Sequence, residues 1–256
     1  MNPKKAVFCW SGGKDSAYCL DKVLSEQLYD IKYLLTTIND KFNRISMHGV
    51  REKLLEMQTA SIGIELLKVP VIEGTNSEYE RQMGSVLLKV KSEGIRHVIF
   101  GDIFLEDLRV YREKNLEKIG MRGIFPIWKL DTKWLINNFI SKGYKTITCC
   151  TNDYLGEEWV GREIDSEFVN QLPEKVDPCG ENGEFHTLCY EGPLFKKKIG
   201  FSIGEKVYKA IEVKTDNVCC TLPQSFNTKG FWFCDLIPQI SKEPSFSESF
   251  LEEILL

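Results

Sequence analysis

The chain has 256 residues, of which 43% are hydrophobic and 27% are charged, proportions typical of a globular protein with a substantial core. Its formal net charge is only −4 and it has no long basic run, which argues against nucleic acid as a main partner. No stretch approaches the roughly 20 apolar residues that span a bilayer, and the N-terminus leads directly into a strand pattern. We therefore expect a cytoplasmic protein without a membrane segment.

The nine cysteines of the chain are expected to be free. Their number is odd, and several lie in apolar, strand-like runs, as is typical of small buried residues in a reducing compartment. The adjacent pairs at 149–150 and 219–220 lack the two-residue spacer of the usual zinc ligand pairs. A structural zinc site is not expected.

A glycine turn at residues 11–16 has the sequence Ser-Gly-Gly-Lys-Asp-Ser. Residues 6–10 before it form an apolar run of the length of a buried parallel strand, and residues 15–28 after it carry apolar side chains at helical spacing. Paired glycines let the backbone approach a ligand closely, and the N–H groups at a helix start attract anions. We interpret residues 11–16 as a phosphate loop; a glycine turn before a capped helix, without a ligand, is the alternative.

The loop differs from a Walker A motif, because Asp15 stands where that motif has a hydroxyl residue after the lysine. It resembles the Ser-Gly-Gly-x-Asp-Ser signature of the PP-loop ATP pyrophosphatases, which adenylate substrates and release pyrophosphate. The resemblance implies that ATP is bound by the residues of the loop, which are Ser11, Gly12, Gly13, Lys14, Asp15 and Ser16.

Strand and helix patterns alternate in the first half of the chain. The pattern predicts strands at residues 31–38, 64–69 and 95–102 and helices at residues 48–60 and 75–91. Pro70 is expected to end the second of these strands. Such alternation predicts a parallel sheet with right-handed crossovers, whose ligands bind at the carboxyl ends of the strands. Residues 11–16, 39–44 and 101–107 would then meet at one edge.

The pattern becomes less regular near residue 125. We expect an α/β fold with a parallel-sheet PP-loop domain at residues 1–125 and a smaller α+β C-terminal domain at residues 126–256. The second part is expected to contain helices at residues 131–141 and 165–171 and extended segments at residues 144–151, 200–213 and 230–237. Residues 245–256 could form an amphipathic helix or an ordered tail.

A second motif, Asp-Pro-Cys-Gly-Glu-Asn-Gly-Glu-Phe-His-Thr, occupies residues 177–187. By itself it could be a solvated turn, or a substrate site that offers carboxylates, an amide, an imidazole and a hydroxyl. It resembles the Glu-Gly-Gly-Glu-Phe/Tyr-Glu-Thr element of the diphthine-ammonia ligase group within the PP-loop superfamily, and Asn182 and His186 are the departures. The turn at residues 101–102 and the Phe-Pro-Ile-Trp segment at residues 125–128 are similar to that group as well.

The resemblance implies an ATP-dependent amidoligase. A substrate carboxylate would attack the α-phosphate of ATP, pyrophosphate would leave, and ammonia or an amine would then displace AMP. Glu181 and Glu184 would orient the substrate or an ammonium ion. The catalytic set implied in this way is Lys14, Asp15, Glu181 and Glu184.

The implied cofactors are ATP and Mg²⁺. Asp15 and Asp102 carry the hard oxygen ligands that Mg²⁺ prefers. The turn of Gly101 and Asp102 would lie beside the nucleotide, and His48 could contact its adenine or ribose. A surface position at the start of a helix is an equal alternative for His48.

The acceptor is expected to be a carboxylate on a small molecule or a protein side chain, and the resemblance implies diphthine on a translation factor for an archaeal or eukaryotic source. Alternatives are an adenylating enzyme of another small-molecule pathway and a non-catalytic ATP- or AMP-binding protein. Sulfur transfer to tRNA would require a catalytic cysteine pair and a basic face, and neither is evident. The oligomeric state stays open, with a homodimer as one option.

Overall fold

The structure is a computed structural model that describes the chain except for residues 1–2, 46–47, 72–75, 212–227 and 240–256. The helix or tail expected at residues 245–256 lies outside the described residues. Among the helices that are described, none combines the length and the apolar character needed to cross a membrane.

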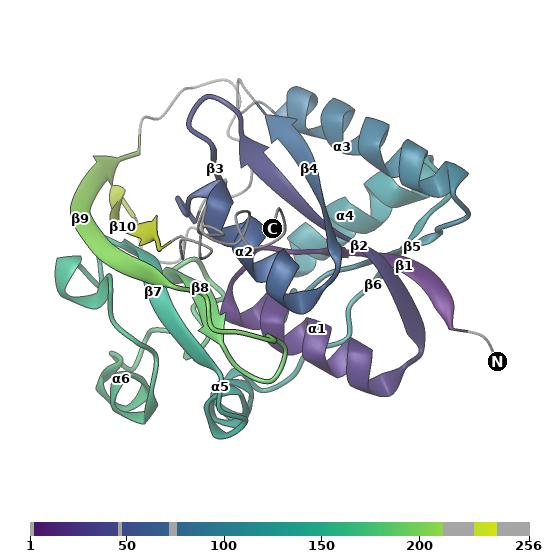
Figure 1. Ribbon diagram of the computed structural model, residues 1–256. Coiled ribbons are helices and arrows are strands. Elements are labelled where there is room, and N and C mark those ends of the chain that lie inside the picture. The colour runs from purple at the N-terminus through teal and green to yellow at the C-terminus, as the bar shows by residue number, and fades with distance from the viewer. Residues whose placement is uncertain (1–2, 46–47, 72–75, 212–227, 240–256) are drawn as a thin grey trace, which may run out of the picture.

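A mostly parallel sheet is built from the first half of the chain (Figure 1). Its strands are β1 (Lys4–Cys9), β2 (Tyr29–Asn39), β3 (Arg44–Ile45), β4 (Glu65–Val71), β5 (His97–Ile99) and β6 (Arg122–Ile124). The parallel strands lie in the order β4, β2, β1, β5, β6, and the short β3 pairs with β2 in the antiparallel direction. The predicted parallel sheet is confirmed.

Helices cover both faces of this sheet (Figure 1). They are α1 (Lys14–Glu26), α2 (Glu52–Ile62), α3 (Asn76–Ser92) and α4 (Glu106–Lys118). Successive residues of a strand point to opposite faces, so Phe8 of β1 joins a core cluster with α1 and α2, whereas Val7 joins a cluster with α3 and α4. Complete burial of such a side chain stabilises the fold by about 1.5–3 kcal/mol.

A second, antiparallel sheet follows in the order β8, β7, β10, β9. Its strands are β7 (Lys145–Asn152), β8 (Phe185–Glu191), β9 (Phe201–Ala210) and β10 (Gly230–Pro238), accompanied by α5 (Thr132–Ser141), η1 (Glu157–Trp159) and α6 (Ser166–Gln171). Ile147 and Leu188 of this sheet share a core cluster with Leu20 of α1 and Leu54 of α2. The predicted fold class, α/β with a smaller α+β part, is confirmed, and the domain boundary near residue 125 stays a prediction.

Three local expectations were wrong. Pro70 lies inside β4, where it is tolerated because β4 is an edge strand that pairs only with β2 among the described strands. The helix expected from residue 48 begins at Glu52, after Gly49 takes a left-handed conformation with φ +66°. Residues 185–191, where no strand was expected, form β8.

Candidate active site

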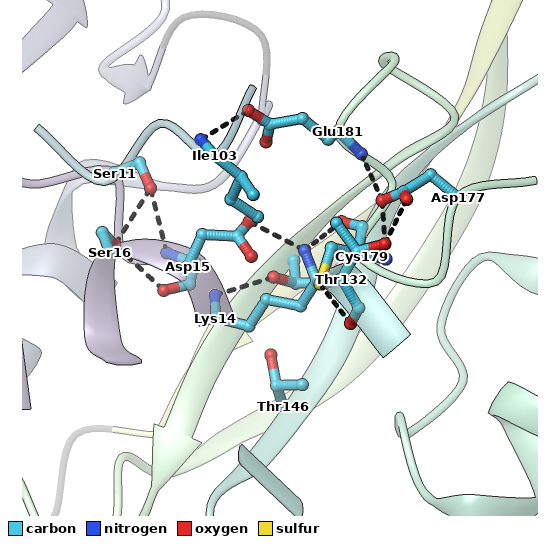
Figure 2. Close-up of polar contacts among 12 residues, drawn as sticks. Ser11, Lys14, Asp15, Ser16, Ile103, Thr132, Thr146, Asp177, Cys179 and Glu181 are labelled. Atoms are coloured by element: carbon cyan, nitrogen blue, oxygen red, sulfur yellow. Dashed lines mark hydrogen bonds and ion pairs between the residues drawn. The ribbon is translucent and has the colours of Figure 1, made fainter. Parts of the chain in front are cut away.

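The phosphate loop, residues 11–16, joins the end of β1 to the start of α1. Gly12 has φ +78°, and a Cβ there would lie 2.7 Å from Oε1 of Gln58. Ser11 Oγ donates to Ser16 Oγ at 3.1 Å, and Ser16 Oγ in turn lies 2.9 Å from the Gly13 carbonyl oxygen (Figure 2). The loop therefore has the left-handed glycine and the helix start that a phosphate site requires.

Strand β8 runs alongside this loop and is bonded to it. The Cys189 N–H donates to the carbonyl of Gly12 at 2.8 Å, and the Lys14 N–H donates to Thr187 Oγ1 at 3.0 Å. Gln58 of α2 completes the contact, because its Nε2 donates to the carbonyls of both Gly12 (2.9 Å) and Cys189 (2.5 Å). The edge of the second sheet thus fixes the backbone of the phosphate loop.

Lys14 points away from solvent, with 2% of its side chain exposed. Its Nζ donates to the carbonyl of Cys179 and to Asp15 Oδ2, the latter at 2.8 Å, and lies 5.2 Å from the ring centre of Phe185. Burial alone would lower the pKa of Lys14, but Asp15, Cys179 and Glu181 together outweigh burial and the pKa is raised. In this arrangement Lys14 is a buried cation that joins the phosphate loop to the loop at residues 177–187, which we call the acidic loop.

Asp15, Asp102 and Glu181 form a cluster of carboxylates from three separate segments. Glu181 Oε1 accepts from the N–H groups of Ile103 at 2.8 Å and Phe104 at 3.2 Å. Burial, together with the negative charges of Asp15 and Asp102, raises the pKa of Glu181 to about 8. Burial also raises the pKa of Asp15 and of Asp102.

The carboxylate oxygens at this cluster are suitable ligands for Mg²⁺. Asp15 Oδ1 is buried without a hydrogen-bond partner among the described residues, while Asp102 forms an ion pair of 3.3 Å with Arg112. Across the described ranges, no group of three or more His, Cys, Asp or Glu side chains could hold a metal by itself. The carboxylates of Asp15 and Asp102 are oxygen ligands of the kind that Mg²⁺ takes, one or two at a time, with phosphate oxygens and water completing its shell.

Gly101 allows the carboxylate cluster to come close to the phosphate loop. A Cβ at Gly101 would lie 3.2 Å from Cα of Ser16 and 3.3 Å from the Asp15 carbonyl oxygen. A larger residue at this position would press on the start of α1, so glycine lets the two segments lie this close without displacing the helix start.

Glu184 is completely buried and stabilises the acidic loop from within. Its Oε1 accepts from the Asp177 N–H at 3.0 Å and from Asn182 Nδ2 at 3.1 Å, while Oε2 is buried without a partner among the described atoms. Asp177 also holds the acidic loop against α5, because its Oδ2 accepts a hydrogen bond from Thr132 Oγ1 at 2.6 Å.

Sequence reasoning missed Gln58, Thr132, Asp177 and Thr187 as site residues. Asp177 and Thr187 lie within the motif that was singled out, so a count of its hydrogen-bonding groups could have included them. Gln58 and Thr132 belong to helical segments with no such signal, and only the folded structure brings them to the loops.

His48 lies beside the phosphate loop. Its Nδ1 is 3.2 Å from the carbonyl oxygen of Thr187, and its Cε1 is 3.2 Å from the position of a Cβ at Gly13. Burial lowers the pKa of His48 to about 4, so the imidazole is neutral near pH 7. The expected contact with adenine or ribose stays a prediction.

A parallel sheet with a phosphate loop after its first strand defines this molecule as an α/β protein of the PP-loop class. Two family models match it, one described as the diphthamide synthase N-terminal domain, over residues 4–123, and the other as the diphthamide synthase C-terminal domain, over residues 131–216. The chain belongs to the diphthamide synthase family.

Curated proteins named diphthine–ammonia ligase are similar to most of the chain. The Danio rerio protein is 25% identical over 223 residues, which cover 77% of this chain and 86% of that protein. The Homo sapiens protein is 21% identical over 257 residues, or 86% of this chain and 96% of that protein. The Schizosaccharomyces pombe protein is 27% identical over 113 residues, or 42% of this chain and 18% of that longer protein.

Proposed function

We propose that this protein is an ATP-dependent ligase that amidates diphthine with ammonia, the reaction after which its relatives are named. The observation that supports this proposal is that hydrogen bonds connect the phosphate loop directly to the acidic loop. Lys14 donates through its backbone N–H to Thr187 and through Nζ to the carbonyl of Cys179. ATP chemistry at one loop and acceptor binding at the other would therefore take place side by side. We place the reaction in the cytoplasm.

In the first step the acceptor carboxylate attacks the α-phosphorus of ATP and pyrophosphate leaves. The backbone N–H groups at the start of α1 would stabilise the negative charge that develops on pyrophosphate, because they are oriented before the reaction begins. Asp15 and Asp102 would hold Mg²⁺, which when bound offsets the negative charge of the phosphates.

In the second step ammonia attacks the acyl carbon of the adenylate, and AMP leaves. Glu181 accepts from the N–H groups of residues 103–104 and interacts electrostatically with Asp15 of the phosphate loop, and we assign it the orientation of the attacking nitrogen. Glu184 would act on the acceptor by fixing the shape of the acidic loop. No covalent bond to the protein is required.

The test is incubation of the full chain with ATP, Mg²⁺, ammonia and a diphthine-bearing translation factor. AMP and pyrophosphate should form in equal amounts with the amide, and formation of ADP would contradict the proposal. Gly12→Ala should reduce turnover by at least about 100-fold, because its Cβ would meet a fully buried Gln58 in a left-handed backbone conformation. Gly84→Ala is the matched control, because Gly84 lies in α3 with no atom within 4 Å of the added Cβ.

A further inference from the structure

Two histidine rings lie in contact, tilted against each other, beside the phosphate loop, and the reaction proposed above gives neither of them a role. The ring centroids of His48 and His186 are 4.6 Å apart, with an angle of 31° between the ring planes. His48 comes from the segment before α2, and His186 comes from β8. Position 186 is one of the two departures from the related motif, which has a glutamate there.

The hydrogen bond of His48 determines what its ring can do. Its Nδ1 faces the carbonyl oxygen of Thr187 at 3.2 Å, and since a carbonyl oxygen only accepts, Nδ1 carries the hydrogen. The neutral ring then has an acceptor at Nε2, which becomes a donor only when the imidazole is protonated. Nε2 is bonded to Cε1, the atom that lies against Gly13 of the phosphate loop.

Residues of β10 and β7 lie next to the two histidines. A Cβ at Gly49 would lie 2.7 Å from Cδ1 of Phe233, so β10 packs directly against the residue after His48. On β7, Cys150 lies in register with His186. The imidazoles are therefore confined between β8, β10 and the phosphate loop, and both keep partial exposure.

Among the described residues, burial and the nearby cation of Lys14 favour the neutral form of both imidazoles. Burial lowers the pKa of His48 and of His186. The hydrogen bond to the Thr187 backbone partly offsets this for His48, and the cation of Lys14 lowers both pKa values further. His48 adds to the shift of His186, and burial raises the pKa of the Cys150 thiol so that it supplies no negative charge. A close negative charge would act in the opposite direction, since each one raises a neighbouring pKa by about 1–3 units.

We propose that the His48–His186 pair takes up a proton when phosphate groups occupy residues 11–16, and that His48 Nε2–H then donates to a phosphate oxygen. The proton comes from solvent on binding and returns to solvent when pyrophosphate leaves. His186 is the positioning residue of the pair, because its ring covers the face of His48. This inference rests on the proposed function only in taking residues 11–16 as a phosphate site.

The direct test is NMR of the full chain labelled in histidine, titrated with pyrophosphate at pH 7. The chain has three histidines, and His97 in β5, which packs on Tyr29, is an internal control. The Cε1–H and Cδ2–H signals of His48 should move to imidazolium positions as pyrophosphate binds, while those of His97 stay unchanged. Signals of His48 that remain at neutral-imidazole positions at saturation would overturn the proposal.

Calorimetry in two buffers of different ionisation enthalpy gives a second measurement. Wild type should take up about half a proton or more per bound pyrophosphate beyond the value for His48→Asn, by linkage between binding and protonation. His97→Asn is the matched control and should behave as wild type, and AMP alone should cause no extra uptake. Equal uptake by wild type and His48→Asn would overturn the inference.

The two proposals fail in different ways. Pyrophosphate binding needs neither acceptor nor turnover, so an absence of amidation leaves this test intact. Binding without proton uptake would contradict the role of the pair alone, whereas a complete absence of pyrophosphate binding would contradict the ATP chemistry as well.

Discussion

In the phosphate loop, residues 11–16, the serine side chains bond within the loop itself. In the acidic loop, residues 177–187, the side chains reach distant parts of the chain. Asp177 bonds to Thr132, and Glu181 bonds to the backbone at residues 103–104. The serine side chains of the phosphate loop therefore bond only locally, whereas the acidic loop combines the internal bonds of Glu184 with long-range bonds from Asp177 and Glu181.

The difference matters for function because the two loops meet through few groups. Lys14 bonds to the acidic loop with both its backbone N–H and its ammonium group, and Glu181 bonds from the acidic loop to the end of β5. Substitutions at these contacts should therefore separate the properties of one loop from those of the other.

The largest effect is expected for Lys14→Met. The change leaves the Cys179 carbonyl without its donor and the Asp15 carboxylate without its cation, and loss of one partner of a buried pair costs about 3–5 kcal/mol. We expect the free energy of unfolding in urea to fall by about 3 kcal/mol, and AMP formation to fall by at least about 100-fold as the loops separate.

The control for Lys14→Met is Lys53→Met, which removes an exposed ion pair with Glu56 and should change stability by less than about 1 kcal/mol. If Lys14→Met lost ATP binding while its free energy of unfolding stayed at the wild-type value, Lys14 would act on the phosphates directly and the link between the loops would be unimportant.

The same contrast explains what could be predicted from the sequence. The parallel sheet followed from alternating patterns, and the phosphate loop from adjacent residues, because local geometry determines both. The inward direction of Lys14 could not be predicted, since lysine is rarely buried and its partner, Cys179, is 165 residues away. Strand β8 was missed because its pairing with β7 and its contact with Gly12 are long-range.

A smaller effect, with a defined pH dependence, is expected for Glu181→Gln. The pKa of Glu181 is raised from 4.5 to about 8 in the folded protein, so its contribution to stability is complete below pH 4.5 and is lost as the pH rises to 8. Glutamine keeps an oxygen for the N–H groups of Ile103 and Phe104 but carries no charge. In urea unfolding, the variant should match wild type near pH 4.5 and exceed it at pH 8.5 by on the order of 2 kcal/mol.

Glu181→Ala is the control for this experiment, because it removes the acceptor together with the charge and should destabilise the protein at low pH as well. A difference between Glu181→Gln and wild type that did not change from pH 4.5 to pH 8.5 would show that Glu181 is ionised throughout, and the carboxylate cluster would then be better solvated than its burial indicates.

The smallest effect is expected within the acidic loop itself, at Asn182→Ala. Asn182 Nδ2 donates to Glu184 Oε1 at 3.1 Å, and the Asp177 N–H donates to the same oxygen at 3.0 Å, so one donor remains after the substitution. We expect a loss of about 1 kcal/mol in urea unfolding. ATP binding should be unchanged, because Asn182 does not bond to the phosphate loop among the described contacts.

Asn182→Asp keeps the size of the side chain but replaces the donor with an acceptor facing Glu184, so it should destabilise more than alanine does. If wild type, Asn182→Ala and Asn182→Asp were equally stable, the bond to Glu184 would contribute nothing, and the long-range contacts of Asp177 and Glu181 would be sufficient to shape the acidic loop.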